Sequence, residues 1–330
     1  MRRSSWIPLV ALGGLLVGGM PACDSSPSAP TTQPPALNVP PPGDFVLNGR
    51  VVGTVTGEPI AGTTVTVGSD TAVTDLDGVF FLTNVSADTR EISISGEGVV
   101  PRVSRLSPGD RDVTVDVIQD RPPFELGFFR ELSRNALEST TGLEPLRPIA
   151  TAPRIYIRTV DEAGQQMDPG LLDLVEAALA DTAPLWSGNR HRLEVIERGP
   201  NTRLGQSGWV TVIFPGEVVT GGGCGKATLG SATGRMELNY LNGGCACSGD
   251  VVAPRTVRHE LGHVYGFWHT TARGGVMSRS WTTRQCNGRP SMREIEHAKY
   301  MYSRTPGNVD PDSDTAGRVL SEPGEIVVED

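Results

Sequence analysis

The sequence predicts a multidomain protein in which an all-β sandwich is followed by an α+β domain. Short β-branched runs, separated by turn residues, recur over residues 45–120 and are typical of a sandwich. From residue 151 the pattern changes to strand, helix and strand, which is typical of an α+β domain. A chain of 330 residues is also long enough to build two hydrophobic cores.

Residues 1–22 have the pattern of an export signal. Arg2 and Arg3 precede an uncharged apolar stretch that is too short to span a bilayer comfortably. The order Met-Pro-Ala-Cys, which ends at Cys23, resembles the lipobox of bacterial lipoproteins, although its proline is unusual. The resemblance implies lipidation of Cys23 and an exported cell-envelope lipoprotein anchored to a membrane. Plain secretion, with cleavage nearby, is the alternative.

Residues 23–44 are rich in Pro, Ser, Thr and Ala, and they contain almost no large apolar side chain. Such a segment cannot bury a core, so we predict an extended tether.

The predicted sandwich, residues 45–120, contains strand-like runs at 46–52, 63–67, 79–82, 92–94 and 113–118. In the last run, valines alternate with threonine and aspartate, as in a half-buried strand. Gly-Arg-Val at 49–51, Gly-Glu-Pro-Ile-Ala-Gly at 57–62 and Thr-Asp-Leu-Asp-Gly-Val-Phe at 74–80 resemble the carboxypeptidase regulatory-like, transthyretin-like module. The resemblance implies an accessory sandwich without catalysis of its own. We interpret Asp75 and Asp77 as parts of a turn rather than as half of a calcium loop.

Residues 121–150 are predicted to be a connector with some helical potential. In the second domain, residues 151–305, strands are predicted at 155–160, 209–214 and 235–241. Asp168 offers an N-cap with Pro169 at the first helical position, and an apolar stripe continues from there to Leu179. Ser291 and Glu294 predict a capping box for a later helix.

Five cysteines are present, and lipidation of Cys23 would leave Cys224, Cys245, Cys247 and Cys286. In an exported protein, four cysteines predict two disulfides, with three possible pairings. The alternative is a zinc site built from the four thiolates. Its spacing is poor because one residue separates Cys245 from Cys247, whereas about two to four residues usually separate paired ligands.

From His259 the sequence reads His-Glu-Leu-Gly-His-Val-Tyr-Gly-Phe-Trp-His. On a helix, His259 and His263 share one face and can bind a single Zn²⁺ at about 2.0–2.1 Å. Glu260 lies at the edge of that face, where its carboxylate can reach a water on the metal. Gly266 can adopt a left-handed conformation and end the helix, which lets the chain return with His269 as third ligand. Three protein ligands leave one position open, as in catalytic zinc sites.

This string matches the signature of the metzincin metallopeptidases at every specified position. Gly-Gly-Val-Met, ending at Met277, resembles the Met-turn of the family, in which the methionine forms a hydrophobic floor beneath the zinc ligands. Arg279 stands where some members have a tyrosine ligand, so we expect no tyrosine switch. The resemblance covers about residues 150–305. It implies an α+β zinc endopeptidase that acts on protein or peptide, with Glu260 as general base. In the family an edge strand binds the substrate backbone, and residues 227–240 are our candidate.

The remaining polar residues give weaker signals. His191 and His297 are interpreted as packing or surface histidines. The acidic residues 306–330 are predicted to be a disordered tail. Asp310, Asp312 and Asp314 imitate the start of a calcium loop, but residues 315 and 321 lack the required Gly and Glu, so structural Ca²⁺ has little support. A net charge of −9 without a basic cluster argues against nucleic-acid binding.

Two other functions stay open. The chain could be a non-catalytic, surface-displayed binding protein in which the sandwich holds the partner. The presence of Glu260 argues against this, because a metal site that has lost its catalytic function could lose that carboxylate freely. The chain could also be a zinc hydrolase that acts on cell-wall peptide amides, because the metal chemistry would be identical.

Overall fold

The computed structural model describes residues 45–217, 223–247, 249–279, 286–314 and 327–329. The expected signal peptide, Cys23 and the tether lie outside the described residues. None of the helices in the described ranges is both long and apolar enough to cross a membrane.

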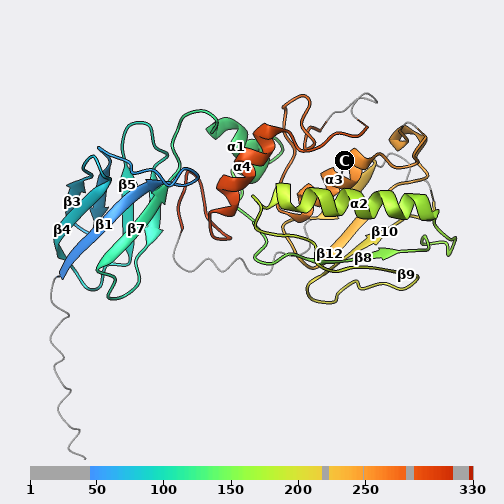
Figure 1. Ribbon diagram of the computed structural model, residues 1–330, viewed down its shortest axis with the longest axis horizontal. Helices are drawn as coiled ribbons and strands as arrows, with labels where there is room; N and C mark the ends of the chain where they lie inside the picture. Colours follow the sequence, from blue (N-terminus) through green and yellow to red (C-terminus); the bar gives the residue numbers. More distant parts are fainter. Residues whose placement is uncertain (1–44, 218–222, 248, 280–285, 315–326, 330) are drawn as a thin grey trace, which may run out of the picture. The chain divides into compact units, whose positions relative to one another are not determined.

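The first domain is a β-sandwich, as predicted, and Figure 1 shows its strands. In one sheet β1 (Phe45–Gly53) lies between β4 (Val79–Val85), which is antiparallel to it, and β7 (Asp112–Val117), which is parallel. The other sheet is antiparallel and has the order β3 (Asp70–Val73), β2 (Thr64–Val67), β5 (Glu91–Ser95), β6 (Arg102–Arg105). Side chains alternate along these strands, so that Phe80 and Leu82 enter the core while Phe81 stays 63% exposed.

The turn before β4 follows from Asp75 and Gly78. The Asp75 carboxylate accepts hydrogen bonds from the backbone N–H groups of Asp77 and Val79, at 2.9 and 2.8 Å. Gly78 has a φ of 72°, which favours glycine. The two aspartates therefore belong to a turn, as the sequence indicated.

The second domain contains a six-stranded sheet. Its order is β13 (Val327–Glu329), β11 (Gly225–Thr228), β12 (Gly234–Leu238), β10 (Trp209–Ile213), β8 (Arg154–Arg158), β9 (Ile196–Gly199). The last four strands are parallel, whereas β11 is antiparallel to both β12 and β13. Helices α2 (Pro169–Trp186) and α3 (Pro254–Val264) pack side by side along this sheet, as Figure 1 shows.

Helix α2 begins where the sequence predicted. The Asp168 carboxylate accepts a hydrogen bond from the N–H of Leu171 at 3.0 Å, and Pro169 occupies the first helical position. Leu171, Val175 and Leu179 then face the core.

Residues 121–150, predicted to be a connector with some helical potential, do more than join the two domains. They contain helix α1 (Leu126–Arg134), and they contribute six large side chains to the core of the second domain: Phe124, Phe128, Phe129, Leu132, Leu146 and Ile149. Helix α1 contacts α4 (Met292–Tyr302), whose capping box between Ser291 and Glu294 is present as predicted.

His297 on α4 is a buried packing residue. Its Nε2 accepts a hydrogen bond from the Glu125 N–H at 2.9 Å, and its Nδ1 lies 2.7 Å from the carbonyl oxygen of Arg293. Burial lowers the pKa of this imidazole, so that the neutral form is favoured. The interpretation of His297 as a packing residue is consistent with these contacts.

Residues 306–314, predicted as the start of a disordered tail, are packed against the folded chain. Asp312 is 1% exposed, and its carboxylate accepts hydrogen bonds from Arg102 at 2.8 Å and Arg304 at 2.7 Å. The Asp314 carboxylate accepts a hydrogen bond from Arg102 at 2.8 Å. The prediction of a solvated acidic run was wrong here, because Arg102, which is distant in the sequence, and the nearby Arg304 neutralise these carboxylates.

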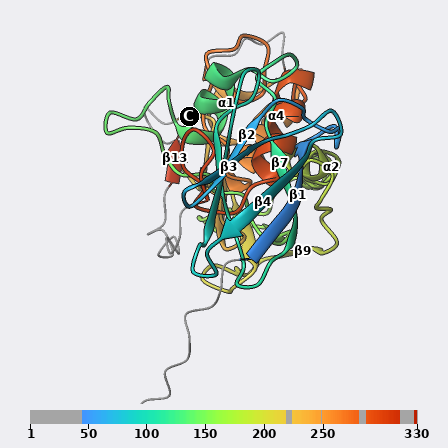
Figure 2. The same ribbon diagram turned by 90° about the vertical axis from the view of Figure 1, so that its left-hand side faces the viewer.

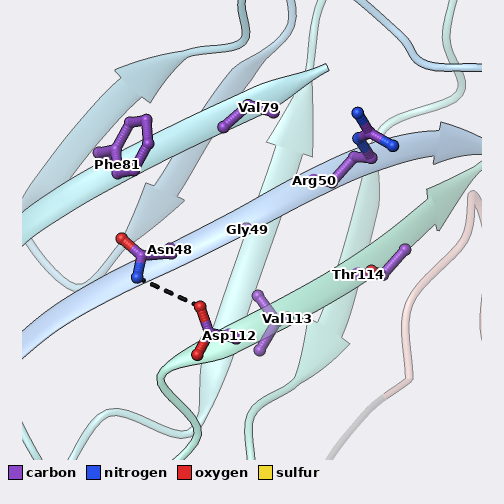
Figure 3. A pocket seen from close by; sticks show the side chains of 8 residues that line it. All are labelled: Asn48, Gly49, Arg50, Val79, Phe81, Asp112, Val113 and Thr114. Carbon is purple, nitrogen blue, oxygen red and sulfur yellow. Dashed lines mark hydrogen bonds between the residues drawn. The ribbon is translucent and has the colours of Figure 1, made fainter. Parts of the chain in front are cut away.

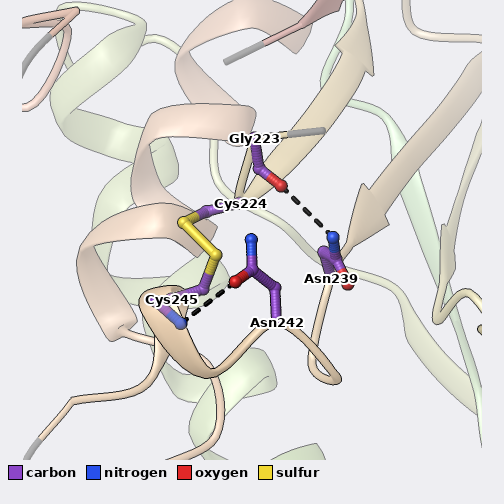
Figure 4. The surroundings of a disulfide bond; sticks show 6 residues. Gly223, Cys224, Asn239, Asn242 and Cys245 are labelled. Carbon is purple, nitrogen blue, oxygen red and sulfur yellow. Dashed lines mark hydrogen bonds between the residues drawn. A yellow bond between two sulfur atoms is a disulfide. The ribbon is translucent and has the colours of Figure 1, made fainter. Parts of the chain in front are cut away.

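Two disulfides are present among the described residues, which confirms their prediction. They join Cys224 to Cys245 and Cys247 to Cys286. Figure 4 shows the first, which ties the residue before β11 to the 3₁₀ turn η1 (Gly243–Cys245). Disulfides of this kind fit a protein outside the cytoplasm.

Candidate metal centre

Helix α3 carries His259 and His263, and Gly266 ends the helical path. Gly266 has a φ of 93°, and its N–H donates to the carbonyl oxygen of His263 at 2.8 Å. A Cβ at this position would lie 2.2 Å from the carbonyl oxygen of Arg147, so only glycine fits the space. The chain then reverses, as the sequence predicted, and brings His269 back toward the helix.

The three imidazoles meet at their Nε2 atoms. The Nε2 of His259 lies 3.0 Å from that of His263 and 3.2 Å from that of His269. All three side chains are buried. The sequence-predicted ligands are therefore brought together, and this group could hold a metal ion.

The opposite ring nitrogens explain why a cation fits. The Nδ1 atoms of His259, His263 and His269 lie 2.7, 2.7 and 2.9 Å from oxygen acceptors, namely Val276 O, Phe267 O and a Glu138 carboxylate oxygen. Each Nδ1 must carry the proton in these contacts, so each Nε2 of a neutral ring presents a lone pair. Three lone pairs at such distances repel unless a cation lies between them. Tetrahedral zinc with Zn–N bonds of about 2.0–2.1 Å would separate the nitrogens by about 3.3 Å, close to the distances observed.

Glu138 was not found by the sequence analysis. Its carboxylate accepts the Nδ1–H of His269 and also lies 3.7 Å from Nη1 of Arg279. It belongs to the segment that was assigned to the connector, 131 residues away from His269. A carboxylate in this position fixes the orientation of the ring and makes its Nε2 a stronger donor to a metal.

If the three histidines hold a metal ion such as Zn²⁺, we expect a Glu138→Gln variant to bind it about 10- to 100-fold more weakly, because the neutral amide cannot stabilise the electron-donating imidazole as a carboxylate does. Zinc affinity is measured by competition with a chromophoric chelator. Glu144→Gln, in the same segment and ion-paired with Arg147 at 3.6 Å, is the matched control. Equal zinc affinities of the two variants would contradict the role assigned to Glu138.

Met277 lies beneath the ligand-bearing helix. Its side chain is buried, and a Cβ placed on Gly262 of α3 would lie 2.4 Å from its sulfur. The preceding residue, Val276, supplies the carbonyl oxygen that faces Nδ1 of His259. The turn that contains Met277 therefore positions the His259 ring through the backbone as well as packing under the helix.

Two charged side chains hold this turn. The Glu294 carboxylate accepts hydrogen bonds from the N–H groups of Met277 at 2.7 Å and Val276 at 3.1 Å. The Arg255 guanidinium donates to the carbonyl oxygen of Val276 at 2.8 Å. The sequence indicated Glu294 as a helix cap, but it gave no sign that the same carboxylate anchors the turn.

Glu260 is fully buried on α3, between the first two ligands in the sequence. Its side chain lies against Gly225, the first residue of β11, since a Cβ there would be 2.5 Å from Oε1 of Glu260. Gly225 follows Cys224, whose disulfide and neighbouring Asn239 appear in Figure 4. The Asn239 N–H donates to the Cys224 carbonyl oxygen at 3.0 Å, so the backbone on this side of Glu260 is fixed.

The predicted substrate-binding segment, residues 227–240, contains the end of β11 (Gly225–Thr228) and all of β12 (Gly234–Leu238). Strand β12 lies inside the sheet, between β11 and β10. Strand β11 begins beside Glu260 of α3, and the edge of β11 that does not pair with β12 is paired with β13.

The sandwich carries a hollow of about 450 Å³ on the outer face of the sheet that contains β1, shown in Figure 3. Phe81 is exposed there, and Asn48 donates a hydrogen bond to Asp112 at 3.2 Å. The hollow contains none of the residues predicted to bind a metal.

The chain matches no protein-family model and no curated protein. Among solved structures, it is similar to two mutant type II cohesin–X–dockerin complexes from Acetivibrio cellulolyticus, with 28% identity over 22% of this chain and a TM-score of 0.18. It spans 51% and 55% of those chains. It is also similar to the major pilin subunit of Bacillus cereus, with 12% identity over 24% of this chain, 31% of that chain and a TM-score of 0.18.

Proposed function

We propose that this protein is a zinc-dependent endopeptidase of the metzincin type, with zinc held by His259, His263 and His269. The observation that carries the proposal is the convergence of three Nε2 lone pairs in a buried site, each ring fixed by an oxygen acceptor at Nδ1. Further support comes from the signature string, which also contains Glu260 and Gly266, and from the position of Met277 beneath the helix.

Zinc bound here would lower the pKa of a water molecule toward neutrality and polarise the carbonyl group of the scissile bond. Glu260 accepts the proton of the attacking water and passes it to the leaving amine nitrogen. Its burial beside Gly225 holds the carboxylate at the site and keeps competing solvent away. Glu138, Glu294 and Arg255 are positioning residues, since they act on the ligand rings or on the turn.

A peptide substrate would bind by adding its backbone to β11, the strand next to Glu260. Main-chain hydrogen bonds to a strand edge hold an extended peptide without requiring one particular sequence, which suits an endopeptidase. The transthyretin-like sandwich is then an accessory domain.

The experiment measures zinc content and the turnover of a peptide library by the wild-type protein and by a Glu260→Gln variant. Near-stoichiometric zinc in both, with turnover in the wild type alone, is the expected result. Zinc without turnover of any peptide would favour a non-catalytic surface-displayed binding protein. A substrate panel that includes cell-wall peptide amides separates general proteolysis from a zinc hydrolase that acts on those amides.

We further propose that the enzyme is exported and held at a membrane by a lipid on Cys23. The two disulfides fit an extracytoplasmic location, and the motif at residues 20–23 supports the anchor. A Cys23→Ser variant should leave the membrane fraction and appear in the soluble fraction, as measured by fractionation and immunoblotting. Membrane association that survives this substitution would count against the anchor.

A further inference from the structure

Strand β13 occupies the outer edge of β11. The two strands are antiparallel, with Thr228 opposite Val327, Ala227 opposite Val328, and Lys226 opposite Glu329. Figure 2 labels β13 near the C-terminal end of the described chain. Because strand addition uses backbone groups, β13 engages the same edge that an incoming extended peptide would need.

This edge lies beside the candidate catalytic residues. Gly225, the first residue of β11, is against the Glu260 carboxylate, and Gly230, just beyond the strand, donates its N–H to the carbonyl oxygen of His263 at 2.9 Å. The register directs β13 from Thr228 toward Gly225, so the chain of β13 advances toward the Glu260 end of β11.

Val328 also makes an apolar contact next to the third histidine. It is buried with Leu229 and Trp268 in a small cluster that is separate from the two large cores. Trp268 directly precedes His269 in the sequence, and its N–H donates to the carbonyl oxygen of Leu132 at 2.7 Å. The backbone at Trp268 is therefore fixed, and the Val328 side chain packs against the apolar surface that Leu229 and Trp268 form.

We infer that β13 is an intramolecular competitor of the peptide substrate, which must leave β11 before a peptide can bind there. This inference rests on the proposed endopeptidase function. Since β13 is joined covalently to the site that it occupies, a short linker would give it an effective concentration on the order of millimolar. A substrate that replaces β13 would place an apolar side chain against Leu229 and Trp268, where Val328 now lies.

The test replaces Val328 with aspartate, which buries a charge against Leu229 and Trp268 and so drives β13 off β11. If β13 occupies the edge for about four fifths of the time, the KM for a fluorogenic peptide falls about fivefold while kcat stays constant. The matched control is Val73→Asp, the same substitution at a residue of β3 that is 65% exposed. It should leave KM unchanged.

A second measurement does not depend on turnover. A labelled peptide with the sequence of residues 323–330 is titrated into zinc-loaded protein carrying Glu260→Gln, with and without Val328→Asp, and binding is followed by fluorescence anisotropy. The peptide should bind about fivefold more tightly when Val328 is replaced, because the intramolecular strand no longer competes. Equal affinities in the two proteins would overturn the inference.

The two measurements separate two kinds of failure. Zinc-loaded protein without turnover in any variant would remove the proposed function, while the anisotropy result would still decide whether β13 competes for the edge. If Val328→Asp unfolds at a lower temperature than Val73→Asp, then Val328→Ala takes its place. That change should shift KM and peptide affinity in the same direction by a smaller factor, and no shift would again overturn the inference.

Discussion

A Glu260→Gln variant should lose about 10²- to 10⁴-fold in kcat, which is the usual contribution of a general base. An amide of nearly the same shape cannot accept the proton of the attacking water. The zinc content should stay near one per chain, because the three Nε2 atoms that converge belong to His259, His263 and His269. Zinc is measured by elemental analysis and kcat with a fluorogenic peptide.

Glu296→Gln is the control for this loss, since it makes the same change of charge on α4, where Glu296 pairs with Lys299 at 2.6 Å. It should retain full activity. Full activity of Glu260→Gln would remove the assigned base. Loss of zinc from that variant would instead show that the carboxylate supports the ligands.

The candidate metal centre could be predicted because the three histidines that form it are close together in the sequence. His259, His263 and His269 lie within eleven residues, and the geometry of one helix followed by one glycine decides where their rings point. The turn at Met277 follows eight residues later. Such a site needs no knowledge of the remaining fold, and the structure brings its members together.

Several supporting contacts could not be predicted, because they join distant segments. Glu138 is 131 residues from His269, and Arg102 is 210 residues from Asp312. The sequence around an aspartate or glutamate that pairs with a buried partner does not differ from the sequence around one that stays in solvent. For this reason the sequence misassigned residues 306–314 as a disordered tail.

The order of the strands in the sheet of the second domain could not be predicted from the sequence either. Runs of β-branched residues predicted strands in the second domain, but they did not show that β12 lies inside the sheet while β11 faces β13. The cysteine count likewise predicted two disulfides and left their pairing open. Only the fold shows that Cys224 and Cys245 form a disulfide beside β11, the strand whose Gly225 lies against the Glu260 side chain.

Replacement of Gly225 by alanine should lower kcat/KM about 100-fold without loss of zinc. The new Cβ would lie 2.5, 2.7 and 2.8 Å from Oε1, Cδ and Cγ of Glu260. The backbone of Gly225 is held by the Cys224 disulfide and by pairing with Leu238, so the Glu260 side chain is the part that moves. A displacement of about 1 Å in a catalytic group can cost this much. Steady-state kinetics and elemental analysis measure both effects.

The control is Gly243→Ala, in the nearby turn η1, where an added Cβ meets no atom within 4 Å. It should retain full activity. A double variant gives the sharpest comparison, because two substitutions that act through one group are not additive. If Gly225→Ala acts only by moving the Glu260 carboxylate, then combining it with Glu260→Gln should lower kcat/KM no further than Glu260→Gln does by itself. Additive losses would mean that Gly225 serves the reaction in another way, such as through the geometry of β11 that receives the peptide.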